Sequence, residues 1–247
     1  LTILSKGFSA VLLNHNALLD YELFQFQSNL NRNYTAVINS RPFWWKRVYL
    51  CKGINGIAYI KGSDWAKDNT SWTEWKEINF EYLAENIPPH EVREIYKKSN
   101  MGLILSGYTG ENTQKLAEGA NYSTGEYLLS GLPVISTPSK GGREFWLNTK
   151  NCIIIEPSTL SLEKSINLCK KYLAVGFFVR EKIREDFIKK ANYCRHLFCN
   201  KLDSLLKDKE ISRSGENLFK DIYFHKLISY NVDRELLIKK AKIAGSF

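Results

Sequence analysis

The sequence predicts an α/β protein in which helices flank a parallel sheet. Short apolar runs with strand character alternate with helical patterns through the first two thirds of the 247 residues. This alternation is typical of right-handed crossovers between parallel strands. Hydrophobic residues make up 44% of the chain and charged residues 25%, which allows one sizeable core. No apolar run approaches the roughly 20 residues that span a membrane, so a transmembrane helix is not expected.

The apolar runs predict where the strands lie. An alternating run extends from Tyr34 to Ile38, and such alternation is typical of a strand. Val134, Ile135 and Ser136 form a short apolar run of the kind that makes a buried parallel strand. The predicted strands cover residues 34–39, 57–60, 101–105, 133–136 and 152–156.

Helices are expected between these strands and after them. Pro89 follows Pro88, and proline is well placed at the first position of a helix. The helices among the strands are predicted over residues 45–52, 89–99, 126–130 and 160–175. From Val179 onward the pattern is helical only, because apolar residues recur at helical spacing. These residues are Ile183, Phe187, Ala191, Phe198, Leu202 and Leu205.

Two carboxylates, Glu118 and Glu126, have seven residues between them in the stretch EGANYSTGEYLLSGLPVIST. An ionised carboxylate accepts hydrogen bonds from hydroxyl groups, and each such bond contributes roughly 1.5–3 kcal/mol. The intervening Tyr122, Ser123 and Thr124 lead into a helix N-terminus, where free backbone amides favour phosphate. A competing interpretation is a capping box, in which Glu126 bonds back to the backbone amide of Ser123.

Two basic residues, Arg41 and Lys46, follow the first predicted strand. Arginine is suited to bidentate contact with phosphate, and lysine acts as a mobile point charge. The pair therefore indicates a diphosphate site. The competing interpretation is that both charges are solvated beside Trp44 and Trp45 at the start of a helix. Arg47 adjoins Lys46 and is a second candidate for its role.

Together these features resemble the retaining GT-B glycosyltransferases, often called glycosyl transferases group 1 or family 4. The likeness rests on E-x7-E followed by GLPV, on Gly141 and Gly142 with Glu144 downstream, and on the Arg and Lys after a strand. It implies a Rossmann-like sheet, one half of a GT-B fold, with a C-terminal helical extension. It also implies transfer of a hexose from a nucleotide-diphosphate sugar to a glycan or lipid-linked acceptor, as in polysaccharide biosynthesis, with retention.

The resemblance gives each residue a role. Arg41 and Lys46 would neutralise the leaving diphosphate, Glu118 would orient the transferred sugar, and Glu126 would hold the ribose. The further donor-binding residues would be Tyr122, Ser123, Thr124, Gly141 and Gly142. No D-x-D sequence occurs, so no metal is expected at the diphosphate. No cofactor besides the donor substrate is implied.

The resemblance covers roughly residues 14 to 200. Asn16, Asp20 and Phe24 fit the N-x-x-D-x-x-x-F linker with which the family leaves its first domain. We do not expect the acceptor half of such an enzyme within these residues, and we expect activity only in its presence. We expect the end of an acceptor domain and a linker over residues 1–30, the nucleotide-sugar-binding domain over 31–176, and the helical extension over 177–247.

Positive charge is concentrated towards the end of the chain. Residues 161–247 hold 19 Lys and Arg against 11 Asp and Glu, and the net charge is +9. A basic segment attracts an anionic membrane by about 1 kcal/mol per residue, so peripheral association with the inner face of a membrane is one expectation and a solvated helix face is the other. Nucleic acid is not an expected partner, because acids interleave with the bases and no binding motif occurs. Five scattered cysteines indicate reduced thiols in a cytoplasmic protein.

Two other functions stay open. A nucleotide-sugar-binding module without turnover would show the same donor site. A sugar-nucleotide epimerase related to the GT-B enzymes would share the fold, although no epimerase motif is recognisable. A lysine context for pyridoxal phosphate, as in phosphorylases of this architecture, is not recognisable either.

Overall fold

The computed structural model describes residues 14–28, 30–62, 74–107, 121–139, 141–207 and 214–219. The chain divides into two compact units. The larger unit is Tyr21–Lys190, and the smaller combines Leu1–Asp20 with Ala191–Phe247. The division falls inside a long helix, α4 (Arg180–Lys207). The domain boundaries expected from the sequence stay predictions.

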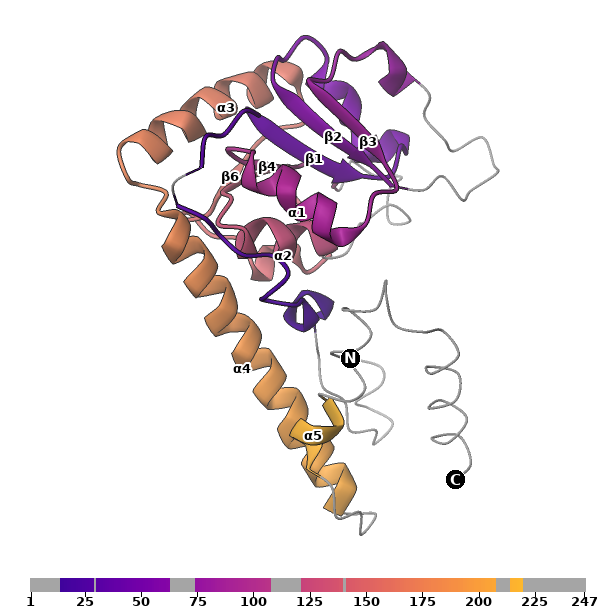
Figure 1. Cartoon of the computed structure of the whole chain (residues 1–247), viewed down its shortest axis with the longest axis vertical. Coiled ribbons are helices and arrows are strands. Elements are labelled where there is room, and N and C mark those ends of the chain that lie inside the picture. The colour runs from indigo at the N-terminus through magenta and orange to yellow at the C-terminus, as the bar shows by residue number, and fades with distance from the viewer. Residues whose placement is uncertain are drawn as a thin grey trace. The chain divides into compact units, whose positions relative to one another are not determined.

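The larger unit is built on a six-stranded sheet with the strand order β3-β2-β1-β4-β5-β6 (Figure 1). Each neighbouring pair is parallel; Val37, for example, pairs with Ala58 on one side and with Gly102 on the other. The expected α/β class and parallel sheet are therefore confirmed. The strands are β1 Ala36–Ser40, β2 Ile57–Lys61, β3 Tyr82–Glu85, β4 Gly102–Ile104, β5 Val134–Ser136 and β6 Cys152–Ile154.

The predicted strands agree with the structure to within two residues at each end, but β3 was not predicted. It is an edge strand that alternates between partly exposed and exposed residues, with Leu83 45% exposed. The central strands are easier to recognise because β2 is buried throughout, and a strand buried on both faces reads as a continuous apolar run.

Helices cover both faces of this sheet (Figure 1). The connections through α1 and α2 step across the sheet in one direction, and the connection from β1 to β2 steps in the other. Right-handed crossovers therefore place α1 and α2 on one face. Helix α3 contacts β5 and the 3-10 turn η4, on the opposite face. These helices are α1 Pro89–Lys97, α2 Tyr122–Leu129 and α3 Thr159–Ala174.

The predicted helix over residues 45–52 is wrong in type. The structure has two 3-10 turns there, η3 (Trp44–Lys46) and η4 (Val48–Cys51). Arg47 between them has φ of 52°, and a left-handed residue cannot continue a right-handed helix. The remaining short elements are η2 His15–Leu18, η5 Glu74–Glu77, η6 Arg143–Phe145 and α5 Gly215–Phe219.

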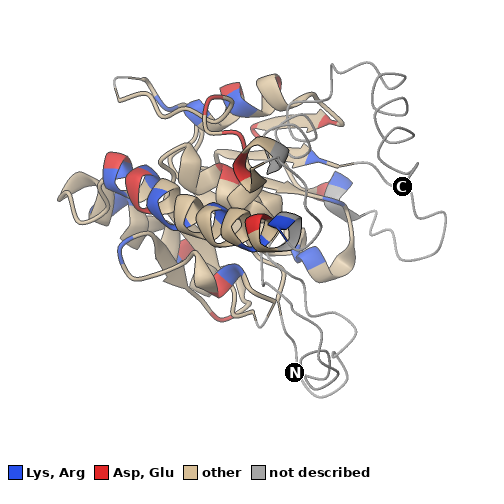
Figure 2. Cartoon of the chain, turned by 90° about the horizontal axis from the view of Figure 1, so that it is seen from below, with Lys and Arg blue, Asp and Glu red and all other residues tan. Residues whose placement is uncertain are grey.

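Arginines of α4 bind backbone carbonyl groups. In the larger unit, Arg184 donates to the oxygen of Tyr21 at 2.8 Å. In the smaller unit, Arg195 donates to the oxygens of Ala17 at 2.5 Å and Leu19 at 2.6 Å. Some basic residues of the C-terminal part of the chain are thus engaged in hydrogen bonds within the protein. Lys and Arg are interspersed with Asp and Glu over the described surface (Figure 2).

Membrane-spanning segments were not expected from the sequence. Among the residues that the structure describes, no helix has both the length and the apolar character needed to cross a membrane. Of the apolar face predicted for the terminal helix, Ile183, Phe187 and Ala191 are buried, and Phe198 and Leu202 are half-buried.

Candidate functional site

The carboxyl ends of β1, β4 and β5 meet at one edge of the sheet, where a buried arginine joins two of them. Arg143, in η6, is 1% exposed. Its guanidinium donates to the hydroxyl of Ser106 at 3.3 Å, to the carbonyl oxygen of Ser106, and to the carbonyl oxygen of Thr137 at 2.6 Å. Gly142, with φ of 98°, turns the chain into η6. Arg143 therefore fixes the loops that follow β4 and β5.

Arg47 is a second buried cation at this edge. It is 3% exposed and donates to the carbonyl oxygens of Leu105 at 3.0 Å and Gly107 at 3.4 Å. Its guanidinium is therefore engaged in holding the end of β4. The interpretation in which Arg47 takes the role of Lys46 is not supported, because its side chain is buried and already bonded.

Lys46 lies within the electrostatic influence of two arginines. Burial, together with the charges of Arg41 and Arg143, lowers the pKa of Lys46 to about 7. Arg41 itself is exposed. Lys46 is partly buried, and the neighbouring cations disfavour its charged form. It is therefore not a solvated surface charge. In the turn that contains Lys46, the rings of Phe43 and Trp45 stack with their centroids 4.4 Å apart.

The carboxylate of Glu126 on α2 accepts a hydrogen bond from a side chain of α1. The hydroxyl of Tyr96 donates to Glu126 Oε2 at 2.7 Å, and Asn39 Nδ2 donates to the same hydroxyl at 2.6 Å. Burial raises the pKa of Glu126 to about 7, and the hydrogen bond from Tyr96 opposes this shift. The side chain keeps part of its surface in contact with solvent. Glu126 is thus an acid that changes charge near neutral pH.

The capping-box interpretation of Ser123 and Glu126 is wrong. Helix α2 begins at Tyr122, and Asn121 is its N-cap. Ser123 is already inside the helix, so its amide is not the cap position. Glu126 accepts its hydrogen bond from Tyr96 instead.

The structure brings together part of the predicted site. Arg41 and Lys46 lie close to each other after β1. Tyr122 and Glu126 lie one turn apart on α2, near enough for the charge of Glu126 to raise the pKa of Tyr122, although burial is the larger cause. Ser123 and Thr124 are buried in the first turn of α2, and Gly141 and Gly142 follow β5. Glu118 lies outside the described residues, and the roles of all these residues stay predictions.

Three residues of the site were missed by sequence reasoning. Arg143 directly follows the glycine pair, and that position was an available signal. Asn39 and Tyr96 are far from Glu126 in sequence, and no spacing connects them. Only the packing of α1 and α2 on the same face of the sheet brings them together.

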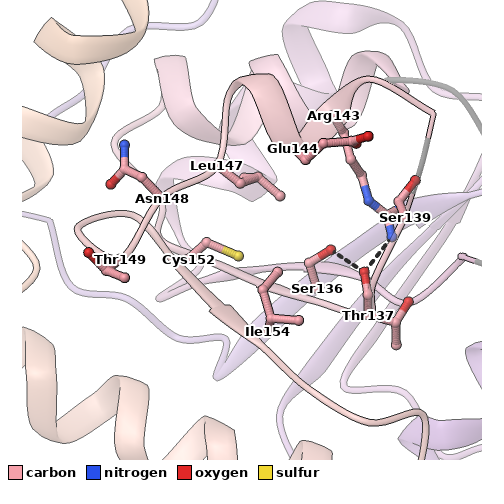
Figure 3. A pocket seen from close by; sticks show the side chains of 10 residues that line it. All are labelled: Ser136, Thr137, Ser139, Arg143, Glu144, Leu147, Asn148, Thr149, Cys152 and Ile154. Carbon is pink, nitrogen blue, oxygen red and sulfur yellow. Dashed lines mark hydrogen bonds between the residues drawn. The ribbon is translucent and has the colours of Figure 1, made fainter.

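A pocket of about 360 Å³ opens beside η6 (Figure 3). Arg143 belongs both to this pocket and to the group of cations around Lys46. Leu147 and Ile154 contribute apolar groups to its lining, and serine, threonine and asparagine side chains contribute polar groups (Figure 3). The lining residues are Ser136, Thr137, Ser139, Arg143, Glu144, Leu147, Asn148, Thr149, Cys152 and Ile154.

The sheet order and its helices define the class of fold, which is a Rossmann-like α/β fold similar to domains of solved GT-B glycosyltransferases. HepE of Anabaena, solved in complex with UDP, matches with a TM-score of 0.53 at 13% identity, over 70% of this chain and 49% of HepE. The C-terminal domain of the glycosyl transferase group 1 protein LpcC from Francisella tularensis matches with a TM-score of 0.50 at 12% identity, over 70% of this chain and 97% of that domain. No protein-family model and no curated protein matches the chain.

The chain spans only part of the length of two of the solved proteins that it matches. It spans 49% of HepE and 36% of TarM, a further solved structure.

Proposed function

We propose that this chain binds a nucleotide-diphosphate sugar as the donor half of a glycosyltransferase, which moves the sugar to a glycan or lipid-linked acceptor. The observation that carries the proposal is the group of cations at the carboxyl edge of the sheet. There, burial and the charges of Arg41 and Arg143 lower the pKa of Lys46 to about 7. A diphosphate placed among these cations would relieve their repulsion. The carboxyl edge is also where open α/β sheets bind ligands.

Each part of the donor meets a suitable group in this proposal. Arg41 and Lys46 balance the negative charge that grows on the diphosphate as the sugar leaves, and the N-terminus of α2 offers backbone amides to the same group. Glu126 accepts hydrogen bonds from the ribose, and Glu118 from the transferred sugar. The remaining donor contacts would come from Tyr122, Ser123, Thr124, Gly141 and Gly142.

Retention and independence from metal are parts of the same proposal. Cations at the position proposed for the diphosphate would make a bridging divalent ion unnecessary for charge balance. Retention is adopted from the resemblance to the retaining GT-B enzymes.

A binding module without turnover is the second candidate, since such a module would show the same donor site. Sugar transfer needs a site closed against water, which a facing domain provides. We therefore expect the isolated chain to bind the donor weakly, to transfer sugar to no acceptor, and at most to hydrolyse the donor slowly. Labelled donors and a panel of lipid-linked and soluble acceptors test this, and robust transfer by the chain alone would contradict it.

Calorimetric titration with UDP and with uridine tests donor binding. Lys46→Ala should weaken UDP binding by roughly ten- to a hundredfold, the effect of one hydrogen bond to a charged group, and leave uridine binding nearly unchanged. Lys52→Ala is the matched control, because the side chain of Lys52 is 70% exposed and pairs only loosely with Glu77 at 3.8 Å. Chelator or added magnesium should change neither result. The proposal fails if the unchanged chain does not bind UDP, and metal independence fails if binding requires a divalent ion.

A further inference from the structure

A chain of hydrogen bonds connects the end of β1 with Glu126 across the face of the sheet. Asn39 Nδ2 donates to the hydroxyl of Tyr96 at 2.6 Å, and this hydroxyl donates to Glu126 Oε2 at 2.7 Å. The backbone amide of Asn39 donates to the hydroxyl of Tyr127 at 2.8 Å. Both tyrosines are fully buried. Hydrogen bonds in series polarise one another, so the donation from Asn39 strengthens the bond from Tyr96 to Glu126.

The ring of Tyr96 is itself fixed by aromatic neighbours. The ring of Phe24 stacks on it with centroids 5.9 Å apart, and the ring of Tyr127 meets it edge-on at 5.0 Å. Phe24 is 3% exposed, and its carbonyl oxygen accepts a hydrogen bond from Arg184. The hydrogen bond from Arg184 therefore fixes the backbone of the segment before β1 at the residue that stacks on Tyr96.

The space for Tyr127 is created by a glycine in β4. A Cβ atom at Gly102 would lie 2.2 Å from Cδ2 of Tyr127, which is closer than carbon atoms approach without a clash. The absence of a side chain there lets the ring of Tyr127 lie against β4 and reach Asn39. The ring of Tyr127 is also one of the two aromatic rings that contact the ring of Tyr96.

We propose that Tyr96 is a positioning residue of the donor site: its hydroxyl fixes the direction of the Glu126 carboxylate, and Phe24 fixes the ring of Tyr96. The inference rests on the proposed function, in which Glu126 binds the ribose. A glutamate side chain rotates about several bonds, and a hydrogen bond to one oxygen removes that freedom while the other oxygen accepts from a ribose hydroxyl. Binding groups locked in this way by supporting contacts give higher affinity than mobile ones.

Among the described residues, the ionisable side chains next to Glu126 are those of tyrosines. Tyr96 of α1 and Tyr122 and Tyr127 of α2 all have pKa values raised by burial, so they stay neutral near pH 7. Lys46 titrates near pH 7 within the same site. A test by pH must therefore follow the carboxyl group of Glu126 directly.

The decisive variant is Tyr96→Phe, which removes the hydroxyl and keeps the ring. UDP affinity at pH 7 should fall by about three- to tenfold, the effect of a typical hydrogen bond, while affinity for inorganic pyrophosphate, which has no ribose, should not change. In a carbon-13 NMR titration without ligand, the midpoint of the Glu126 carboxyl signal should move to higher pH, because the lost bond favoured the carboxylate. In a Glu126→Ala background, which has no side-chain acceptor for the Tyr96 hydroxyl, Tyr96→Phe should have no further effect on UDP affinity.

Tyr34→Phe is the matched control, since its ring lies 5.8 Å from Tyr82 near the amino end of the sheet, and it should leave UDP affinity and the carboxyl midpoint unchanged. Phe24→Leu should weaken UDP binding in the same direction as Tyr96→Phe, which provides a second test if Tyr96→Phe does not fold. Unchanged UDP affinity and an unchanged midpoint in either variant would overturn the positioning role and leave the proposed function standing. Failure of the unchanged chain to bind UDP would overturn both.

Discussion

Arg47 donates a hydrogen bond to the carbonyl oxygen of Leu105 at 3.0 Å, which ties the turn after β1 to the end of β4. Its backbone is left-handed and its side chain is buried. The adjacent Lys46 stays at the edge of the sheet, where Arg41 and Arg143 act on it. Two neighbouring basic residues therefore lie in different surroundings: Arg47 is bonded to the loop, and Lys46 is the one for which we propose contact with the diphosphate.

Binding of UDP should be coupled to proton uptake by Lys46. The pKa of Lys46 is about 7 without ligand, and a diphosphate raises it by favouring the charged form. UDP affinity should therefore fall as the pH rises from 7 to 9, and the calorimetric enthalpy near pH 7 should vary with the ionisation heat of the buffer.

Lys46→Arg separates this effect from protonation elsewhere. Arginine stays charged at these pH values, so the variant should take up fewer protons than the unchanged chain on binding UDP. Equal proton uptake by the two proteins would show that Lys46 does not contact the diphosphate.

The two carboxylates of the E-x7-E pair should affect different ligands. Glu118→Ala should weaken binding of UDP-glucose far more than binding of UDP, whereas Glu126→Ala should weaken both, by roughly ten- to a hundredfold for one hydrogen bond to a charged group. Calorimetric titration of both variants with both ligands measures this. Small and equal effects would indicate that neither carboxylate touches the donor.

Local signals in the sequence predicted the sheet but not the support of the site. The runs that became β1, β2, β4 and β5 are apolar because the sheet is covered on both faces. Edge strand β3 carries no such run. The turn at Arg47 depends on hydrogen bonds to residues almost 60 positions away, so the sequence indicated a helix there instead.

The difference between Lys46 and Arg47 likewise could not be predicted from local sequence signals. Both are basic and adjacent, and their roles separate only when the ends of β4 and β5 are in place. The link from Tyr96 to Glu126 likewise joins residues 30 positions apart, which belong to different helices. Spacing within a motif identifies groups on one element, whereas tertiary packing decides which other groups hold them.

Protein stability should depend on pH through Glu126. Its folded-state pKa is raised to about 7 from an ordinary value of 4.5, so its contribution is fully present below pH 4.5 and is lost as the pH rises through 7. Glu126→Gln does not titrate, so the unfolding free energy of the unchanged chain should fall relative to that of the variant by about 2–3 kcal/mol between pH 5 and pH 8. Urea unfolding at both pH values measures the difference, which would be constant if the carboxyl group were solvated.

Arg143 should be required for stability of the site loops. Arg143→Met removes the hydrogen bonds that the buried guanidinium donates to Ser106 and Thr137. Each carbonyl oxygen keeps one hydroxyl donor, so the expected cost is that of the lost bonds from a charged group, about 1.5–3 kcal/mol. Arg93→Met is a suitable control, because Arg93 pairs with Glu94 at the surface and such changes cost at most about 0.5 kcal/mol. Urea unfolding midpoints compare the two, and similar midpoints would contradict the bracing role of Arg143.

The most direct test of the account is the footprint of UDP on the amide NMR spectrum of this chain. The account predicts that UDP shifts the amide signals of residues 41–47, 121–127 and 141–143, and that Lys46→Ala reduces these shifts at the same UDP concentration. No shifts at millimolar UDP, or shifts confined to residues 191–207 of the smaller unit, would contradict a donor site at the carboxyl edge of the sheet.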